Sequence, residues 1–205
     1  MSERFYDLDL ETQPGRVFTP RAKTERLVAQ ALALIGGRPA RVADVGTGAG
    51  TIAIAVAVNA SRAEVWATDV SVDAVALAAR NADRHGVGDR VHVRLGDLLE
   101  PLDGEFDLIL ANLPYLSDTR RLPQYAHEPA EAVYAPRDGL ALYRRLLATA
   151  PGRLCPGGHV VLQFVGEIFA AEREEAGGLL ARLEEAEPAL VAALEASLID
   201  SSVKR

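Results

Sequence analysis

Residues 42–50 read Val-Ala-Asp-Val-Gly-Thr-Gly-Ala-Gly and are the most informative part of the sequence for predicting the fold. This stretch leaves an apolar run typical of a buried strand, turns through glycines at alternate positions, and enters an apolar helical segment over residues 51–59. Glycines there let a ligand approach the main chain, and the start of the helix offers free N–H groups. The stretch therefore predicts a ligand-binding turn between a strand and a helix.

Strand-like and helical segments alternate around this turn. Runs rich in Val, Ile or Leu are expected to form strands at 41–45, 64–68, 90–95, 106–111 and 159–164, with helices at 51–59 and 72–84. Such alternation is typical of right-handed crossovers. We expect an α/β fold with a Rossmann-like, doubly wound, mainly parallel sheet of about five to seven strands. In that order the first and fourth strands are neighbours.

Composition bounds the remaining possibilities. With 205 residues and 49% hydrophobic content, the chain suits one well-buried core. A formal charge of −7 disfavours a long nucleic acid bound through its phosphates. A single cysteine excludes an intramolecular disulfide, no Cys/His cluster has metal-ligand spacing, and no segment is long and apolar enough for a membrane span. We expect a cytoplasmic protein without a metal site or membrane contact.

The segments before the glycine turn are expected to cover it. Residues 1–18 are polar and without periodicity, which predicts an arm or lid. Thr19 followed by Pro20 resembles a helix start, and the apolar stripe after it ends at Gly36-Gly37. The predicted division is an arm over 1–18, a cofactor-binding core over 19–165 and a helical extension of the same domain over 166–205.

The segments after the fourth strand run from a long connection to the tail. Residues 117–138 predict a partly helical excursion, followed by a helix over 139–150 and a Pro-Gly-Gly turn at 156–158. From Gly166 the Glu- and Ala-rich sequence predicts helix, with a break at Pro188. Its apolar face would pack on the domain, which we favour, or bind a second copy or a small partner: Leu179, Leu180, Leu183, Leu190, Val191, Leu194 and Leu198.

Carboxylates at three successive strand ends predict a nucleoside site. A dinucleotide site would have its third glycine where Thr51 stands, which disfavours NAD or FAD. Asp44 would face a cationic ligand group, Asp69 a ribose diol, and Asp97 with Leu98 an adenine ring. The alternative is a generic glycine turn with surface aspartates. The predicted cofactor-binding residues are Asp44, Gly46, Thr47, Gly48, Gly50, Asp69, Val70, Asp97, Leu98 and Asn112.

The fourth strand ends in Asn112-Leu-Pro-Tyr115, which predicts a methyl-acceptor site. An amide nitrogen is a poor nucleophile, so a transferase gains by holding both of its N–H groups. The Asn112 side-chain oxygen and the Leu113 carbonyl can accept those two hydrogen bonds. Pro114 would stiffen the turn and Tyr115 would offer a ring face to a planar group. The predicted catalytic residues are Asn112, Pro114 and Tyr115; the alternative is a strand-ending turn in which asparagine caps the backbone.

Together these motifs resemble the class I S-adenosylmethionine-dependent methyltransferases, and more narrowly the HemK-type protein-glutamine methyltransferases that modify release factors. The resemblance runs from about Phe18 to Phe164 and rests on Thr19-Pro-Arg-Ala-Lys-Thr-Glu25, Asp44-Val-Gly-Thr-Gly-Ala-Gly50, Asp69, Gly96-Asp97, Asn112-Leu-Pro-Tyr115, Glu128-Pro129 and Asp138-Gly-Leu140. It implies S-adenosyl-L-methionine as cofactor, S-adenosyl-L-homocysteine as product, and a glutamine amide bound by Asn112, the Leu113 carbonyl, Pro114 and Tyr115.

Three features differ from that family. Leu113 stands where the family usually has proline, and Asn-Leu-Pro-Tyr also occurs in adenine dimethyltransferases of ribosomal RNA. A short arm takes the place of an N-terminal helical domain, and residues 166–205 are predicted helical where the family has an antiparallel hairpin. The leading hypothesis is methylation of a glutamine amide in a protein such as a release factor. Adenine methylation in RNA or DNA and a catalytically idle cofactor-binding subunit are the alternatives.

Overall fold

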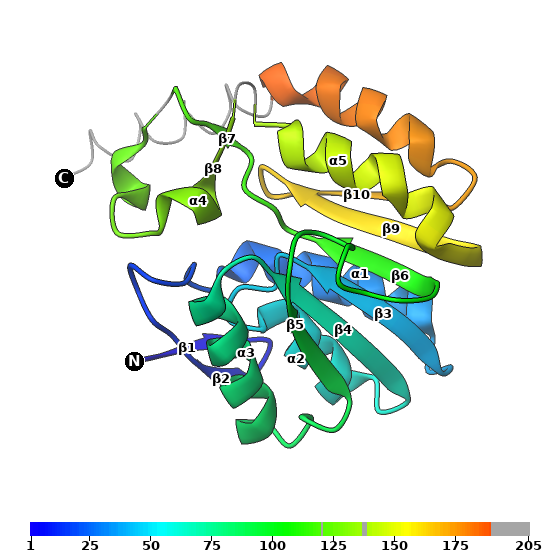
Figure 1. Ribbon diagram of the computed structural model, residues 1–205, viewed down its shortest axis with the longest axis horizontal. Helices are drawn as coiled ribbons and strands as arrows, with labels where there is room; N and C mark the ends of the chain where they lie inside the picture. The colour runs from blue at the N-terminus through cyan, green and yellow to red at the C-terminus, as the bar shows by residue number, and fades with distance from the viewer. Residues whose placement is uncertain (120, 137–138, 190–205) are drawn as a thin grey trace.

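A six-stranded sheet forms the centre of the molecule in the computed structural model, which describes residues 1–119, 121–136 and 139–189 (Figure 1). The strand order is β10-β9-β6-β3-β4-β5. Only β10 is antiparallel to its neighbour; the other pairs are parallel. This confirms the predicted doubly wound, mainly parallel sheet. The strands are β3 (Ala40–Val45), β4 (Ala63–Asp69), β5 (Val91–Leu95), β6 (Phe106–Ala111), β9 (Leu154–Phe164) and β10 (Glu167–Glu172).

Helices cover both faces because successive side chains of a buried strand point to opposite sides. In β3, Val42 packs in one core and Ala43 and Val45 in the other. The first core includes α1 (Glu25–Ile35), α2 (Thr51–Asn59) and the end of α3 (Val72–Arg84); the second includes α5 (Ala141–Thr149) and the helical residues 179–189. In Figure 1, α5 and the orange C-terminal helix lie in front of the sheet, and α1 and α2 lie behind it.

The first residues of the chain form a hairpin, where the sequence predicted an arm without regular structure. The strands β1 (Ser2–Phe5) and β2 (Leu8–Glu11) pair antiparallel, and Phe5 and Leu10 are buried in the first core. Each strand has only four residues, too few for a recognisable alternation. The hairpin is therefore part of the packed fold, and a lid formed by the segment after it stays a prediction.

Asn81 on α3 joins this hairpin to the glycine turn. Its side-chain oxygen accepts a hydrogen bond from the Glu11 N–H at 2.8 Å. Its amide nitrogen donates to the Glu11 carbonyl at 3.0 Å and to the Ala49 carbonyl at 2.9 Å. Because Asn81 is completely buried, these bonds replace water for three backbone groups. One side chain thus fixes β2, the glycine turn and α3 relative to one another.

The helix predicted to start at Thr19 begins later. Residues 19–21 have no regular secondary structure, a 3-10 turn, η1, spans Ala22–Thr24, and α1 starts at Glu25. Thr19 caps no helix; its N–H and hydroxyl donate to Glu128 at 3.0 and 3.3 Å. The end of the helix is as predicted, because Gly36 adopts φ +58° and donates its N–H to the Leu32 carbonyl.

The long connection after β6 is partly helical, as predicted. It contains β7 (Leu116–Ser117), the 3-10 turn η2 (Pro123–Tyr125), α4 (Ala130–Val133) and β8 (Tyr134–Ala135), which pairs with β7. After α5, the 3-10 turn η3 (Ala150–Arg153) leads into β9. The strand β9 starts at Leu154 and includes the Pro-Gly-Gly predicted as a turn; its register against β6 shifts between Phe106 and Leu108.

The expectation of a wholly helical region after Gly166 is wrong for its first part. Residues Glu167–Glu172 form β10, an antiparallel edge strand beside β9. After the 3-10 turn η4 (Ala176–Gly178), residues 179–189 are helical, and the helix includes Pro188 rather than breaking there. Leu179 and Leu183 are buried in the second core, with Leu180 packed against it. The other apolar positions of the predicted face, Leu190, Val191, Leu194 and Leu198, lie outside the described residues.

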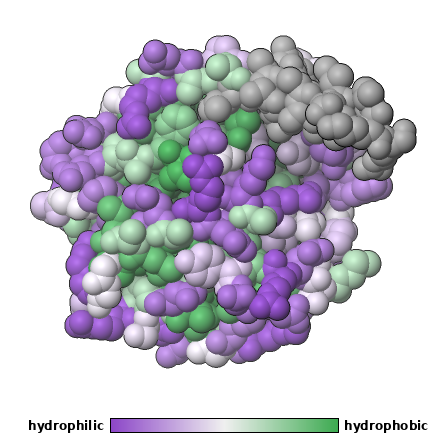
Figure 2. All heavy atoms as spheres, turned by 180° about the vertical axis from the view of Figure 1, so that it is seen from behind, coloured by the Kyte–Doolittle hydropathy of each residue, from purple (hydrophilic) through white to green (hydrophobic). Residues whose placement is uncertain are grey.

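The helices in the described part of the chain do not meet the requirements for a membrane-spanning helix. No helix in residues 1–119, 121–136 or 139–189 combines the length and apolar character needed to cross a bilayer. Seen from behind, hydrophilic and hydrophobic residues are interspersed over the drawn face (Figure 2). Neither class of residue dominates that face.

We expect Asn81→Ala to lower the free energy of unfolding by about 2–4 kcal/mol, because three buried backbone groups lose their partner. Denaturant titration followed by circular dichroism would measure the change. The matched control is Asn59→Ala at the exposed end of α2, where only one local bond to the Ala55 carbonyl is lost. Equal losses in the two variants would contradict the role of Asn81.

Candidate active site

The glycine turn lies directly against the predicted acceptor motif. The N–H groups of Gly46 and Thr47 both donate to the Thr68 carbonyl at 2.9 Å, which fixes the turn above the end of β4. Gly46 has φ +72°, and a Cβ at this position would lie 2.8 Å from Cδ2 of Leu113. Because β3 and β6 are adjacent in the sheet, the turn and Asn112 face each other as predicted, despite their distance in sequence.

Asp69, at the end of β4, is held by main-chain donors. One carboxylate oxygen accepts from the Gly48 N–H and the other from the Ser71 N–H, both at 2.9 Å. Burial raises the pKa of this carboxyl group, while these bonds oppose the shift. Each oxygen keeps a further lone pair, so the carboxylate can still accept hydrogen bonds from a ligand.

A cavity of about 160 Å³ opens at the carboxyl ends of β3, β4 and β5. Its wall includes the glycine turn and, from the segment after the hairpin, Arg16, Val17, Phe18, Pro20 and Arg21. Most of the predicted cofactor-binding residues line it: Gly46, Thr47, Gly48, Asp69, Val70, Asp97, Leu98 and Asn112. The structure thus gathers these positions around one space, and their contact with a cofactor stays a prediction.

Gly50 and Asp44 do not line this cavity, and their contact with a cofactor stays a prediction. Gly50 packs against α2 and α3, since a Cβ there would meet Ile54 of α2 at 2.7 Å and Ala78 of α3 at 3.2 Å. This close packing and its φ of +81° both favour glycine at the position.

Asp44 lies completely buried beneath the turn. One carboxylate oxygen, Oδ2, accepts from the Thr47 hydroxyl at 2.6 Å and from the Ala53 N–H at 3.0 Å. The other, Oδ1, has no hydrogen-bond partner among the described residues. Burial raises the pKa of Asp44 to about 6, against the opposing effect of its two hydrogen bonds. The group is therefore a buried, half-satisfied carboxylate next to the cavity.

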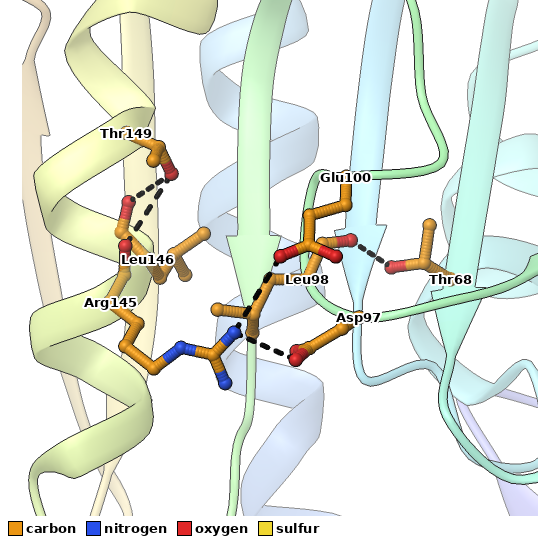
Figure 3. Close-up of polar contacts among 7 residues, drawn as sticks. All are labelled: Thr68, Asp97, Leu98, Glu100, Arg145, Leu146 and Thr149. Carbon is orange, nitrogen blue, oxygen red and sulfur yellow. Dashed lines mark hydrogen bonds and ion pairs between the residues drawn. The ribbon is translucent and has the colours of Figure 1, made fainter.

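Asp97 is positioned by α5 across the rim of the cavity. Arg145 donates to Asp97 at 2.7 Å and lies 3.8 Å from Glu100, so one guanidinium contacts both acids of the turn after β5 (Figure 3). Beside them the Thr68 hydroxyl donates to the Leu98 carbonyl at 2.8 Å. These contacts hold in place a turn that connects β5 to β6 without a helix.

Asn112 has one side of its carboxamide fixed and the other side available. Its Nδ2 donates to the Thr24 hydroxyl at 3.3 Å, and Thr24 is only 4% exposed. This contact orients Oδ1 as the acceptor end of the group. The Leu113 carbonyl accepts from the Tyr143 hydroxyl at 3.0 Å and keeps its second lone pair. The two acceptors predicted for a planar nitrogen are therefore held by buried partners.

A second cavity, of about 360 Å³, meets the first at Asn112, Leu113 and Pro114. Tyr115 lines it, and the Tyr115 ring packs edge-on against Phe164 with 5.5 Å between ring centres. Burial, reinforced by Tyr125, raises the pKa of the Tyr115 hydroxyl well above its ordinary value, so this group stays neutral. Of the catalytic residues predicted from the sequence, Asn112 and Pro114 lie where the two cavities join and Tyr115 lines the second cavity; their roles stay predictions.

The segment 16–24 contributes to both cavities, which the sequence did not reveal beyond the resemblance of Thr19–Glu25 to a family motif. Phe18, Arg21 and Thr24 line the first and the second cavity. Glu128 holds this segment to the excursion after β6: its side chain is 5% exposed and accepts from Thr19 and Arg21. A glutamate satisfying loop amides is a structural element rather than a catalytic group.

Comparison with known proteins identifies a family. The family model described as "Methyltransferase small domain" matches residues 21–132. A release factor glutamine methyltransferase of Xylella fastidiosa is 44% identical over 174 residues, covering 82% of this chain and 62% of that protein. A ribosomal protein uL3 glutamine methyltransferase of Bordetella pertussis is 41% identical over 155 residues, covering 72% and 52%. The chain thus spans about three fifths of the length of the Xylella relative.

A solved structure shares the fold of the site. The RNA methyltransferase of Salinibacter ruber, in complex with S-adenosyl-L-homocysteine, superposes with a TM-score of 0.50 at 26% identity. The match covers 71% of this chain and 76% of that one.

Asp44 predicts a pH dependence of stability. Its pKa is about 6 in the folded protein and 3.8 when exposed, so the folded state holds this proton more tightly. The contribution of protonated Asp44 to the free energy of unfolding is fully present below pH 3.8. It is lost as the pH rises through 6, and the total loss is up to about 3 kcal/mol. The difference in unfolding free energy between Asp44→Asn and the wild type should therefore grow in favour of the variant between pH 4 and 6. Denaturant titrations across this range would measure it, and a constant difference would contradict the assignment.

Proposed function

Because the chain belongs to the methyltransferase small domain family, we propose that it transfers the methyl group of S-adenosylmethionine to a glutamine side-chain amide of a protein. The observation that carries this proposal is the meeting of two cavities at Asn112, Leu113 and Pro114. One cavity has the polar edge of a nucleoside site, and the other has the aromatic wall of a site for a planar group.

The residues of the first cavity fit S-adenosylmethionine. Asp69 offers a carboxylate to a ribose diol, and the Gly46–Gly48 backbone allows a ligand to approach closely. Val70 is 65% exposed and, with Leu98, offers an apolar surface to an adenine ring. The unpaired Asp44 oxygen beneath the turn favours a cationic amino group above it. When bound, the cofactor supplies an electrophilic methyl group and leaves as S-adenosylhomocysteine.

The chain's own residues position the acceptor nitrogen. Oδ1 of Asn112 and the Leu113 carbonyl accept its two N–H groups, which directs the nitrogen lone pair toward the first cavity. Tyr115 and Tyr125 line the second cavity and offer aromatic ring surface to the planar amide. No dedicated base is required, because the nitrogen becomes acidic once its new bond to carbon has formed and then releases a proton to water.

A protein acceptor is supported by the relatives, whose names specify a release factor and ribosomal protein uL3. The formal charge of −7 also disfavours RNA or DNA as the acceptor. A release factor or ribosomal protein as substrate would place the reaction in the cytoplasm. The proposal also includes binding of a second copy of the chain, or of a small partner protein, to the C-terminal helical segment.

The test of the function combines an acceptor comparison with one variant. Wild-type protein incubated with isotopically labelled cofactor should label a release factor and leave ribosomal RNA unlabelled. Asn112→Ala should lower kcat/KM by about 100-fold, because one of the two acceptors for the nitrogen is lost. Calorimetry should show S-adenosylhomocysteine binding within a few-fold of wild type.

Asn59→Ala, at an exposed site on α2, is the matched control for the loss of an asparagine side chain. Labelling of RNA alone would support adenine methylation instead. Cofactor binding without labelling of either acceptor would support an idle subunit.

Thr24 should act through Asn112. Thr24→Val removes the hydroxyl that accepts from Nδ2, so the carboxamide can turn its donor end toward the substrate; we expect kcat to fall about tenfold. Thr24→Ser keeps the hydroxyl and should retain most of the activity. Steady-state kinetics of both variants would decide, and a valine variant as active as the serine variant would exclude this role.

A further inference from the structure

Gln163 lies beside Asn112 at the same edge of the sheet. The parallel register pairs Ala111 of β6 with Leu162 of β9, so the next residues, Asn112 and Gln163, are neighbours at the ends of adjacent strands. Adjacent strands are about 4.8 Å apart. Gln163 also lines the second cavity together with Asn112. The main chains of Asn112 and Gln163 therefore lie about one strand spacing apart, and both residues line the same space.

The Gln163 side chain is buried, and its carboxamide oxygen Oε1 has no hydrogen-bond partner among the described residues. The residue is only 4% exposed. A buried carboxamide oxygen without a donor is unfavourable and uncommon in native proteins. The backbone cannot easily move the group away, since the Gln163 carbonyl accepts from the Tyr143 hydroxyl at 2.6 Å and the residue pairs with Ile168 of β10.

We propose that Gln163 is a specificity-determining residue, whose Oε1 accepts a main-chain N–H of the acceptor polypeptide next to the glutamine that is methylated. The proposal rests on the proposed function. Asn112 and the Leu113 carbonyl use both N–H groups of the target nitrogen, so a third acceptor one strand spacing away needs a different donor. Every residue of a polypeptide except proline carries such a donor on its main chain.

Gln163 also distinguishes a polypeptide from the alternative acceptor. Adenine offers only the two N–H groups of its exocyclic amine, and its ring nitrogens are acceptors. With both of those N–H groups bound by Asn112 and the Leu113 carbonyl, an adenine base leaves Oε1 of Gln163 without a donor. Phe18, Tyr115 and Val165 give this cavity apolar walls, so a peptide N–H that enters finds Oε1 of Gln163 as a hydrogen-bond acceptor.

The first experiment replaces Gln163 by methionine, which has a similar shape and no acceptor oxygen. With a release factor as substrate, kcat/KM of Gln163→Met should fall about tenfold, while the affinity for S-adenosylhomocysteine stays within twofold. The Tm should be unchanged or higher, because an unpaired buried oxygen has been removed. Gln30→Met, at an exposed position of α1, is the matched control and should equal wild type in all three measurements.

The second experiment identifies the donor. A glutamine-containing release-factor peptide is made with an ester in place of the amide N–H at the glutamine or at the residue after it. One of the two esters should slow the wild type about tenfold and slow Gln163→Met less than twofold. Equal effects of each ester on both proteins would overturn the proposal, as would wild-type kcat/KM in Gln163→Met.

A lower Tm with a parallel loss of cofactor binding would also overturn it, because Gln163 would then serve the fold. The failure of the function itself has a different signature. Wild-type protein that binds S-adenosylhomocysteine but labels no polypeptide would overturn both proposals, whereas an active wild type with an unaffected methionine variant overturns only this one.

Discussion

The parallel pairing of β3 with β6 is the constraint on which the site depends. Val45 pairs with Ala111, so the glycine turn that follows one strand and the Asn112 motif that follows the other emerge side by side. Contact between Gly46 and Leu113 leaves no room for a side chain at the glycine. The cofactor cavity and the acceptor cavity therefore share a wall, and the distance between the two bound groups is set by the sheet rather than by flexible loops.

Buried polar side chains fix the remaining walls to that frame. Asn81 joins the hairpin to the glycine turn, and Glu128 joins the segment before α1 to the excursion after β6. Thr24 and Tyr143 hold the acceptor motif in place by hydrogen bonds to Asn112 and Leu113, each from a different face of the sheet. Every one of these contacts crosses between elements far apart in sequence. The site is thus assembled by side chains that local sequence patterns do not mark.

This explains which parts could be predicted from the sequence. Apolar runs buried on both faces gave the strands, and α2 and α3 were predicted within their observed bounds. The start of α1 was not predicted correctly, because Thr19 donates a hydrogen bond to Glu128 of another element instead of capping a helix. Residues 167–172 are acidic at both ends and resemble a helix locally; they form a strand because the edge of β9 is open to them. No local sequence pattern marked Gln163 as a site residue, since its burial follows from the register of β6 and β9.

The single phenolic proton of Tyr143 has a consequence for the chemistry beside it. The hydroxyl lies 3.0 Å from the Leu113 carbonyl and 2.6 Å from the Gln163 carbonyl, and it can point its proton fully at only one of them at a time. The strength of the hydrogen bond that the Leu113 oxygen accepts from Tyr143 can therefore change without any movement of the backbone. Rotation of one O–H bond, in a side chain that is otherwise immobile, tunes how strongly that oxygen attracts an incoming N–H.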